Sequence, residues 1–333
     1  MRTAGLRSVA CLLATALAAC GAPLREQAVT VERPSARLRG TLFAPDVRGR
    51  LPAVLLLHGS GPDGRDNPYY RQLAESFGRR GIATLVYDKR GSGESTGDWR
   101  VEPFTALIDD AEAALRVLRA HPWVDPTRVG IWGGSEGATI APLVAARAPG
   151  TAFVILQSMS GVPFGDQYLH QAAREFRGRA ADSVAAVELV RAKLAYLRDR
   201  TRWPAYDSLV RASAGRSFSA YASPVTEDSW WWRWYATKLD VSALPVLRSL
   251  RSPTLAIWGA EDVLVPAEAS RDAFVVARAP AEGRGDAVWF IEGASHTLHV
   301  PGVRGLVAGA GLRNRPVHLR EMAAWAAERV RLP

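Results

Sequence analysis

One short segment of the chain carries a serine in a setting that suits nucleophilic attack. Residues 129–137 read Val-Gly-Ile-Trp-Gly-Gly-Ser-Glu-Gly, so an apolar run passes directly into the pattern Gly-x-Ser-x-Gly around Ser135. The run that follows, 138–148, is helix-like. A strand that turns sharply into a helix at this pattern holds the serine hydroxyl clear of the sheet, because the glycines let the backbone turn tightly. Glycine-rich turns without chemistry share the pattern, so the rest of the chain must supply a base, an acid and oxyanion donors.

A second glycine-rich turn indicates where an oxyanion would be held. Residues 58–62 read His-Gly-Ser-Gly-Pro and follow the continuous apolar run 52–58. The predicted donors are the backbone N–H of Ser60 and the N–H of Glu136, the residue directly after the serine. Two such donors in a water-poor cavity each stabilise a transition state by about 3 kcal/mol. His58 is interpreted as a structural residue that braces the turn and takes no proton.

Two further turns supply candidates for the acid and the base. Residues 258–262, Trp-Gly-Ala-Glu-Asp, end in Asp262, which is preferred to its neighbour Glu261 because Gly-x-x-Asp is the recurring spacing of such loops. Residues 293–296, Gly-Ala-Ser-His, place His296 just after an apolar run, and His299 is the nearby alternative. Asp262 would fix the tautomer of His296 and stabilise the imidazolium that forms when the ring takes the serine proton.

Each of these segments follows a predicted strand. Apolar runs predict strands at 28–31, 36–43, 52–58, 82–87, 128–132, 153–157, 254–258 and 287–291, and helical patterns occupy 69–80, 104–120, 138–148, 267–278 and 317–331. This alternation predicts an α/β fold with a mainly parallel sheet covered by helices on both faces. From 162 to 250 the chain reads helical, polar and aromatic. We therefore expect an α/β core formed by 28–161 and 251–333, with 162–250 as a helical insertion.

The order serine, aspartate, histidine, each at the end of a separate strand, is that of the α/β-hydrolase triad. With the four turns above and Asp-Lys-Arg-Gly-Ser-Gly-Glu-Ser at 88–95, the sequence resembles α/β-hydrolases, in the bacterial esterase branch related to serine aminopeptidases and dienelactone hydrolases. The resemblance covers about 30–330 apart from the insertion. It implies a serine hydrolase of the carboxylesterase type that cleaves esters through an acyl-enzyme on Ser135, with His296 as base and Asp262 as its partner. It implies no metal and no organic cofactor.

The segment 88–95 is glycine-rich and basic, but it lacks the spacing of the phosphate-binding motifs. In the hydrolases that it resembles this loop is architectural, so no catalytic role is assigned to it. Ser95 is a poor rival nucleophile because it lacks the strand–turn–helix setting of Ser135.

The insertion resembles a hydrolase lid and is rich in aromatic residues. It contains Trp203 and the cluster Trp-Trp-Trp-Arg-Trp-Tyr at 230–235. Lids of this family cover the catalytic serine, so Trp230, Trp231 and Trp234 are expected to line the substrate cavity. Packing of the lid onto the core is the alternative reading of the same cluster.

Three other functions stay open at this point. A thioesterase uses the same machinery as an esterase, and an aminopeptidase adds an acidic group that holds the substrate amine. Glu227 or Asp228 of the insertion could be that group. A surface-displayed binding protein on a hydrolase scaffold would be non-catalytic.

Composition narrows the class of partner. The chain has 333 residues, 48% of them hydrophobic, and a formal charge of +9, which is typical of a globular protein. The basic residues are scattered over helix-like stretches and are interpreted as solvated faces. No nucleic-acid motif is present, so the predicted partner is a small-molecule ester, with no nucleic acid.

The N-terminus predicts export. Arg2 and Arg7 precede the apolar run 9–19, which is too short to span a bilayer. The run ends Leu-Ala-Ala-Cys-Gly, which resembles the lipobox of bacterial lipoproteins, where the cysteine is lipidated and becomes the new N-terminus. The only other cysteine, Cys11, lies in the segment to be removed, so Cys20 would have no disulfide partner.

We therefore expect residues 1–19 to be a signal peptide, Cys20 to be lipidated and 20–27 to be a tether. Loss of 1–19 leaves a formal charge of +7. The expected location is the bacterial cell envelope, with a lipid anchor in the membrane, and in the outer membrane where two membranes are present. A plain secretory signal with an incidental cysteine is the alternative.

Overall fold

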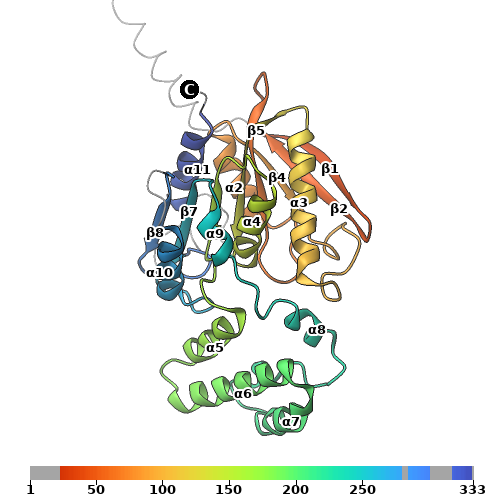
Figure 1. Cartoon of the computed structure of the whole chain (residues 1–333), viewed down its shortest axis with the longest axis vertical. Helices are drawn as coiled ribbons and strands as arrows, with labels where there is room; N and C mark the ends of the chain where they lie inside the picture. The colour runs from red at the N-terminus through yellow and green to blue at the C-terminus, as the bar shows by residue number, and fades with distance from the viewer. Residues whose placement is uncertain (1–22, 280–283, 301–316, 332–333) are drawn as a thin grey trace, which may run out of the picture.

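The computed structural model describes residues 23–279, 284–300 and 317–331 (Figure 1). The predicted signal peptide, Cys20 and the first part of the predicted tether lie outside these residues. No helix in the described ranges is long and apolar enough to cross a bilayer.

The core is one sheet of eight strands in the order β1-β2-β4-β3-β5-β6-β7-β8. β1 and β2 pair antiparallel, as do β2 and β4, and every other neighbouring pair is parallel. The strands are β1 (Arg25–Arg33), β2 (Ala36–Ala44), β3 (Leu51–Leu57), β4 (Ala83–Tyr87), β5 (Val124–Gly134), β6 (Val154–Gln157), β7 (Thr254–Gly259) and β8 (Ala287–Ile291).

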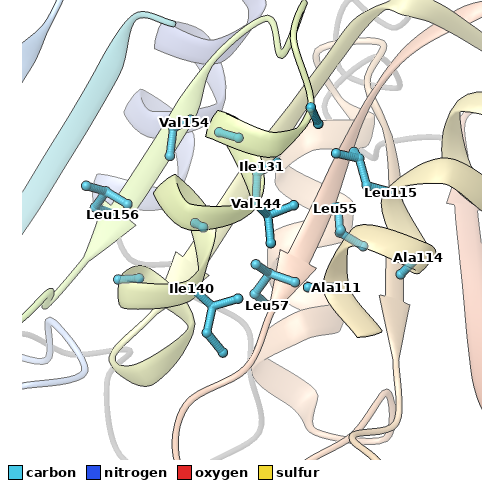
Figure 2. Close-up of a cluster of buried hydrophobic side chains, with 14 of the residues drawn as sticks. Leu55, Leu57, Ala111, Ala114, Leu115, Ile131, Ile140, Val144, Val154 and Leu156 are labelled. Atoms are coloured by element: carbon cyan, nitrogen blue, oxygen red, sulfur yellow. The ribbon is translucent and has the colours of Figure 1, made fainter. Parts of the chain in front are cut away.

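Helices cover both faces of this sheet, because successive strand residues point to opposite faces. The helices of the core are α2 (Pro68–Gly78), α3 (Phe104–Ala120), α4 (Glu136–Arg147), α10 (Ala267–Arg278) and α11 (Val317–Arg329). On one face Leu55 and Leu57 of β3 share a buried cluster with residues of α3 and α4 (Figure 2). Residues of α10 belong to the same cluster. On the other face Val54 and Leu56 pack with residues of α2 and α11. The predicted α/β fold, mainly parallel and covered on both faces, is confirmed.

Two strands begin earlier than their apolar patterns indicated. β1 starts at Arg25, where a polar, largely exposed segment pairs with the end of β2, so its first residues fall within the predicted tether. β5 starts at Val124, which pairs with Leu51 ahead of a shift in register. In both places backbone pairing extends a strand beyond its buried residues, and side-chain patterning carries no signal of that extension.

Between β6 and β7 the chain is helical throughout its regular elements. These are α5 (Phe164–Glu175), α6 (Ala180–Arg198), η1 (Arg200–Arg202), α7 (Trp203–Ala212), η2 (Ser219–Ala222), α8 (Trp230–Ala236) and α9 (Leu244–Ser249). The helices α5 to α8 share a buried cluster of their own, in which Tyr196, Tyr206 and Trp232 pack ring against ring. In Figure 1 these helices lie apart from the helices that cover the sheet, while α9 packs on α10 of the core.

Candidate active site

The turn between β5 and α4 places Ser135 in a strained conformation. Its φ is 54° and its ψ is −114°, a region that costs a non-glycine residue about 1–3 kcal/mol. The turn is also tight, since a Cβ on Gly133 would lie 2.1 Å from the carbonyl oxygen of Gly137. A Cβ on Gly137 would lie 2.3 Å from the carbonyl oxygen of Leu57. Gly133 is thus required by the tightness of the turn itself, and Gly137 by close backbone packing against β3.

Positive φ angles gather around this turn. Among the described residues the non-glycine examples are Ser135, Ser158 and Leu298, which follow β5, β6 and β8. Hydrogen bonds connect the three loops: the amide of Ser135 donates to the carbonyl of Gln157 at 2.8 Å, and the Ser158 hydroxyl donates to the carbonyl of His296 at 2.7 Å. Backbone strain is therefore concentrated at the carboxyl ends of the parallel strands.

Asp262 and His296 meet from neighbouring strand ends. His296 Nδ1 lies 2.7 Å from Asp262 Oδ2, and the carboxylate is 2% exposed. The other carboxylate oxygen accepts the N–H groups of Leu264 at 2.8 Å and Val265 at 2.9 Å. Gly259 permits this approach, because a Cβ there would lie 2.3 Å from a carbonyl of the loop that carries His296. With Nδ1 donating to the carboxylate, Nε2 is the ring nitrogen that remains to accept a proton.

The alternatives weighed from sequence lie elsewhere. Glu261 is half-exposed and forms an ion pair with Arg177 at 3.1 Å. The backbone of His299 closes a turn with Ser295. Within the described ranges no hydrogen bond joins Ser135 Oγ to the His296 ring, and such contacts are often long before substrate binds.

A cavity that opens to solvent adjoins Ser135, and its empty space, including the part continuous with solvent, is about 490 Å³. Its lining residues are Ser60, Phe104, Ser135, Glu136, Thr139, Ser158, Ser160, Val162, Phe164, Gln167, Lys238, Val241 and Val265. Ser60 and Glu136 thus share the cavity with the serine. Neither of their amides donates to a loop or side-chain acceptor in the described part of the chain, so both are free to donate to an oxyanion. Glu136 opens the twelve-residue helix α4, whose N-terminal dipole adds to this effect.

The side chain of Glu136 is the feature that sequence reasoning missed. Its carboxylate accepts a hydrogen bond from Lys89 Nζ at 3.0 Å, from Lys238 Nζ at 3.2 Å and from Ser60 Oγ at 3.2 Å. Lys89 belongs to the segment 88–95, which the resemblance describes as architectural and without a catalytic role, and Lys238 follows α8 in the helical insertion. We call Lys89, Glu136 and Lys238 the buried ionic triad.

Burial and charge act in opposite directions within the triad. Burial would raise the pKa of Glu136, but Lys89 and Lys238 together lower it to about 2. Burial lowers the pKa of Lys238 to about 8, against the pull of the Glu136 carboxylate. Glu136 is therefore an anion and Lys238 a cation at pH 7.

His58 lies close to the triad but stays neutral. Burial, helped by the charge of Lys89, lowers its pKa to about 4, and its Nε2 donates to the carbonyl of Tyr87. The ring thereby joins the turn after β3 to the end of β4, in keeping with a structural residue.

A compositional signal for the triad exists in the sequence. The chain has three lysines among 42 basic residues, the remainder being arginine. All three lysines, Lys89, Lys193 and Lys238, are at most 4% exposed. A chain that uses arginine on its surface has retained lysine only at buried positions, and two of the three contact one carboxylate.

The three tryptophans expected in the cavity are not among its lining residues. Trp230 is partly exposed and packs on Trp99. Trp231 stacks on Tyr235 with ring centroids 3.4 Å apart. Trp234 packs on Lys238, with its ring centroid 3.4 Å from Lys238 Nζ. The insertion instead contributes Val162, Phe164, Gln167, Lys238 and Val241 to the wall.

No cluster of histidine, cysteine, aspartate and glutamate that could hold a metal ion occurs among the described residues.

Comparison with known proteins places the chain in context. The family model described as serine aminopeptidase, S33, matches residues 51–300. The chain is similar to the esterase EstD of Thermotoga maritima, at 32% identity over 124 residues, which is 36% of this chain and 30% of that protein. It is similar to the thiohydrolase aneE of Aspergillus aculeatus, at 37% identity over 106 residues, which is 31% of this chain and 32% of that protein. The matches thus span about a third of the length of these relatives.

Among solved structures, the esterase Pf2001 of Pyrococcus furiosus has a similar fold. Its TM-score is 0.60 at 17% identity, with 99% of this chain and 95% of that chain covered.

Proposed function

This chain belongs to the serine aminopeptidase S33 family of α/β-hydrolases, and from that premise we propose that it is a serine hydrolase that cleaves carboxylic esters. The observation that carries the proposal is the convergence of three strand ends: a strained Ser135 turn on a cavity wall, beside a loop that holds His296 Nδ1 2.7 Å from buried Asp262. A strained nucleophile and an oriented imidazole are the two parts that acyl transfer needs.

The proposed reaction has two halves. Ser135 Oγ attacks the ester carbonyl while His296 Nε2 takes its proton, and Asp262 stabilises the imidazolium. The amides of Ser60 and Glu136 hold the oxyanion. His296 then protonates the departing alcohol and leaves an acyl group on Ser135. Water, deprotonated by His296, repeats the sequence and releases the acid.

The Glu136 side chain helps to hold the two proposed oxyanion donors in place. Its carboxylate accepts the hydroxyl of Ser60, so the two residues that supply the oxyanion donors are also joined through their side chains. The lysine contacts hold that carboxylate in place.

A thioester is the second candidate substrate, favoured by the similarity to a thiohydrolase. The same serine, base and oxyanion donors serve either leaving group. An aminoacyl substrate is disfavoured, because Glu136, the carboxylate among the described lining residues, is already paired with two ammonium groups. Glu227 and Asp228 are exposed and do not line the cavity.

The test is a panel of 4-nitrophenyl esters, alkyl thioesters and aminoacyl anilides, measured with the wild-type chain and Ser135→Ala. We expect ester turnover in the wild type and its loss in Ser135→Ala, with unchanged circular dichroism. Labelling of the wild type, and not of the variant, by a fluorophosphonate probe identifies the nucleophile. Higher activity on anilides than on esters would favour a peptidase, and a folded chain that neither turns over nor labels would be a binding protein.

We also propose that Cys20 is lipidated and anchors the protein in the bacterial envelope, on the strength of the Leu-Ala-Ala-Cys-Gly segment. Expression in a bacterium with radiolabelled palmitate tests this. The wild-type chain should be labelled and fractionate with membranes, whereas Cys20→Ser should be unlabelled. Equal labelling of both chains would reject the anchor.

A further inference from the structure

The buried ionic triad leaves an uncompensated positive charge at the cavity. Lys89 and Lys238 share the single carboxylate of Glu136, at 3.0 and 3.2 Å. Lys89, Glu136 and Lys238 are all nine-tenths or more buried. A buried charge is costly unless another group pairs with it. One ammonium group of the triad therefore lacks an anionic partner of its own.

Lys238 is the ammonium group that reaches the cavity. It lines the wall together with Glu136, whereas Lys89 does not. Lys89 Nζ is further used by a hydrogen bond to the carbonyl of Gly59. Lys238 Nζ donates one hydrogen bond, to Glu136, and otherwise faces the rings of Trp234, Phe164 and Tyr235, at 3.4, 4.4 and 5.3 Å from their centroids. An ammonium group carries three donors, so Lys238 retains the capacity to bind a further acceptor.

Other charges near the site do not balance this one. Among the described lining residues, Glu136 and Lys238 are the charged side chains. Asp262 does not line the cavity. Its carboxylate oxygens already accept hydrogen bonds from two backbone amides and from the ring of His296. Gln167 adds an uncharged donor to the wall, whereas the Ser160 hydroxyl already donates to the carbonyl of Val162 at 2.9 Å.

We propose that the cavity takes esters whose acyl part carries a carboxylate, and that Lys238 is the residue that binds it. This inference rests on the proposed function, because it names the acyl group that Ser135 would accept. The acyl group stays attached to Ser135 after the alcohol leaves, so the cavity beside Ser135 is where an acyl carboxylate would meet Lys238. A carboxylate there completes the charge balance of the triad, and an ammonium group in the same place is repelled.

Three 4-nitrophenyl esters that differ only at the far end of the acyl chain test the proposal. The adipate monoester ends in a carboxylate, the 6-methylheptanoate is its neutral isostere, and the 6-aminohexanoate ends in an ammonium group. We expect kcat/KM to be about tenfold or more higher for the adipate monoester than for the neutral ester, the effect of one hydrogen bond to a charged group. The ammonium ester should be the poorest of the three.

The variant is Lys238→Met, which keeps the length and volume of the side chain and leaves Glu136 paired with Lys89. In this variant the ratio of kcat/KM for the anionic and neutral esters should fall towards one. Lys238→Arg, which keeps the charge, should retain a ratio above one. Lys193→Met is the matched control, a buried lysine of the insertion that is off the cavity wall, and its ratio should equal that of the wild type.

The outcomes separate this inference from the proposed function. Equal kcat/KM for the anionic and neutral esters, with turnover that depends on Ser135, overturns the inference and leaves the esterase intact. A preference that survives Lys238→Met also overturns it. If no ester is turned over and no fluorophosphonate label appears, the proposed function fails. Calorimetry with adipate and the Ser135→Ala chain then decides: binding that Lys238→Met removes supports the anion site, and no binding rejects it.

Discussion

The part of the site built on the sheet and the part built on the helical insertion hold their residues by different means. On the sheet, Ser135 and His296 sit on short loops whose backbones approach so closely that Gly137 and Gly259 admit no Cβ. On the insertion, Lys238 is held by the carboxylate of Glu136 and by three aromatic rings, those of Trp234, Phe164 and Tyr235. The sheet therefore positions the proposed catalytic groups by backbone geometry, whereas substitution of a single side chain in the insertion can alter substrate preference.

The largest expected effect lies on the sheet side. Asp262→Asn should lower kcat by about 10⁴-fold, because an amide at this position favours the wrong tautomer of His296. Steady-state kinetics on a neutral ester measures it. The control is Glu261→Gln, next to it on the same loop but half-exposed, which should keep kcat close to the wild type. A large loss in Glu261→Gln and a small one in Asp262→Asn would transfer the role to Glu261.

The buried ionic triad joins the sheet side to the insertion side, so its loss should give the largest fall in the free energy of unfolding. Glu136→Gln leaves Lys89 and Lys238 buried without an anion, so the free energy of unfolding should fall by about 3–5 kcal/mol. Urea denaturation at pH 7 gives the value. Glu26→Gln breaks an exposed pair with Arg71, at 2.9 Å, and should cost at most about 1 kcal/mol. If both variants lose the same amount, the triad does not join the two parts.

The preference for the anionic over the neutral ester should change with pH through Lys238 of the insertion. Lys238, with a pKa of about 8, is cationic below that pH and neutral above it. The ratio of kcat/KM for the adipate monoester and its neutral isostere should therefore fall about five- to tenfold between pH 7 and pH 9. Changes in the shared catalytic groups cancel in this ratio.

The groups that face Lys238 leave the direction of this change intact. Glu136 stays anionic, because its pKa is about 2. Tyr235 stays neutral, because burial raises its pKa. Lys89 lies on the other side of the Glu136 carboxylate. Lys238→Arg should keep its preference to pH 9, because guanidinium does not deprotonate there. A wild-type ratio that is flat with pH would assign the preference to another group.

The smallest effect is expected at the exposed contact between the two parts. Arg177, just beyond α5, pairs with Glu261 at 3.1 Å, and both side chains are about half exposed. Arg177→Ala should lower the free energy of unfolding by less than about 1 kcal/mol, with no change in the ester ratio. Thermal denaturation in low and high salt measures it. A loss as large as that of Glu136→Gln would mean that the insertion is held chiefly from its surface.

The sheet side was largely predictable from sequence. Buried parallel strands are continuous apolar runs, and loops such as 133–137 follow them with glycines at fixed spacing, so local patterns carried both the fold and the candidate residues. The approach of Asp262 to His296 follows from two neighbouring parallel strands, β7 and β8, ending at one edge. The starts of β1 and β5 were missed because they depend on backbone pairing and not on burial.

The insertion side was not predictable in the same way. Lys89 and Lys238 are 47 and 102 residues from Glu136, and no local pattern connects such positions. The size of the tryptophans at 230–234 suggested that they line the cavity, but in the separate helical cluster large rings pack mainly on one another. A small count of a common residue type, three lysines, was the available clue.

The burial of all three lysines gives the folded chain an unusual chemical surface. Its exposed side-chain cations are guanidinium groups, which do not react with acylating reagents or with formaldehyde and borohydride under mild conditions. Lysine labelling of this protein thus reports opening and not surface exposure. Mass spectrometry of the modified chain would give separate modification rates for Lys238, which reports opening of the buried ionic triad, and for Lys193, which reports opening of the interior of the insertion. Comparing the two rates requires no engineered probe.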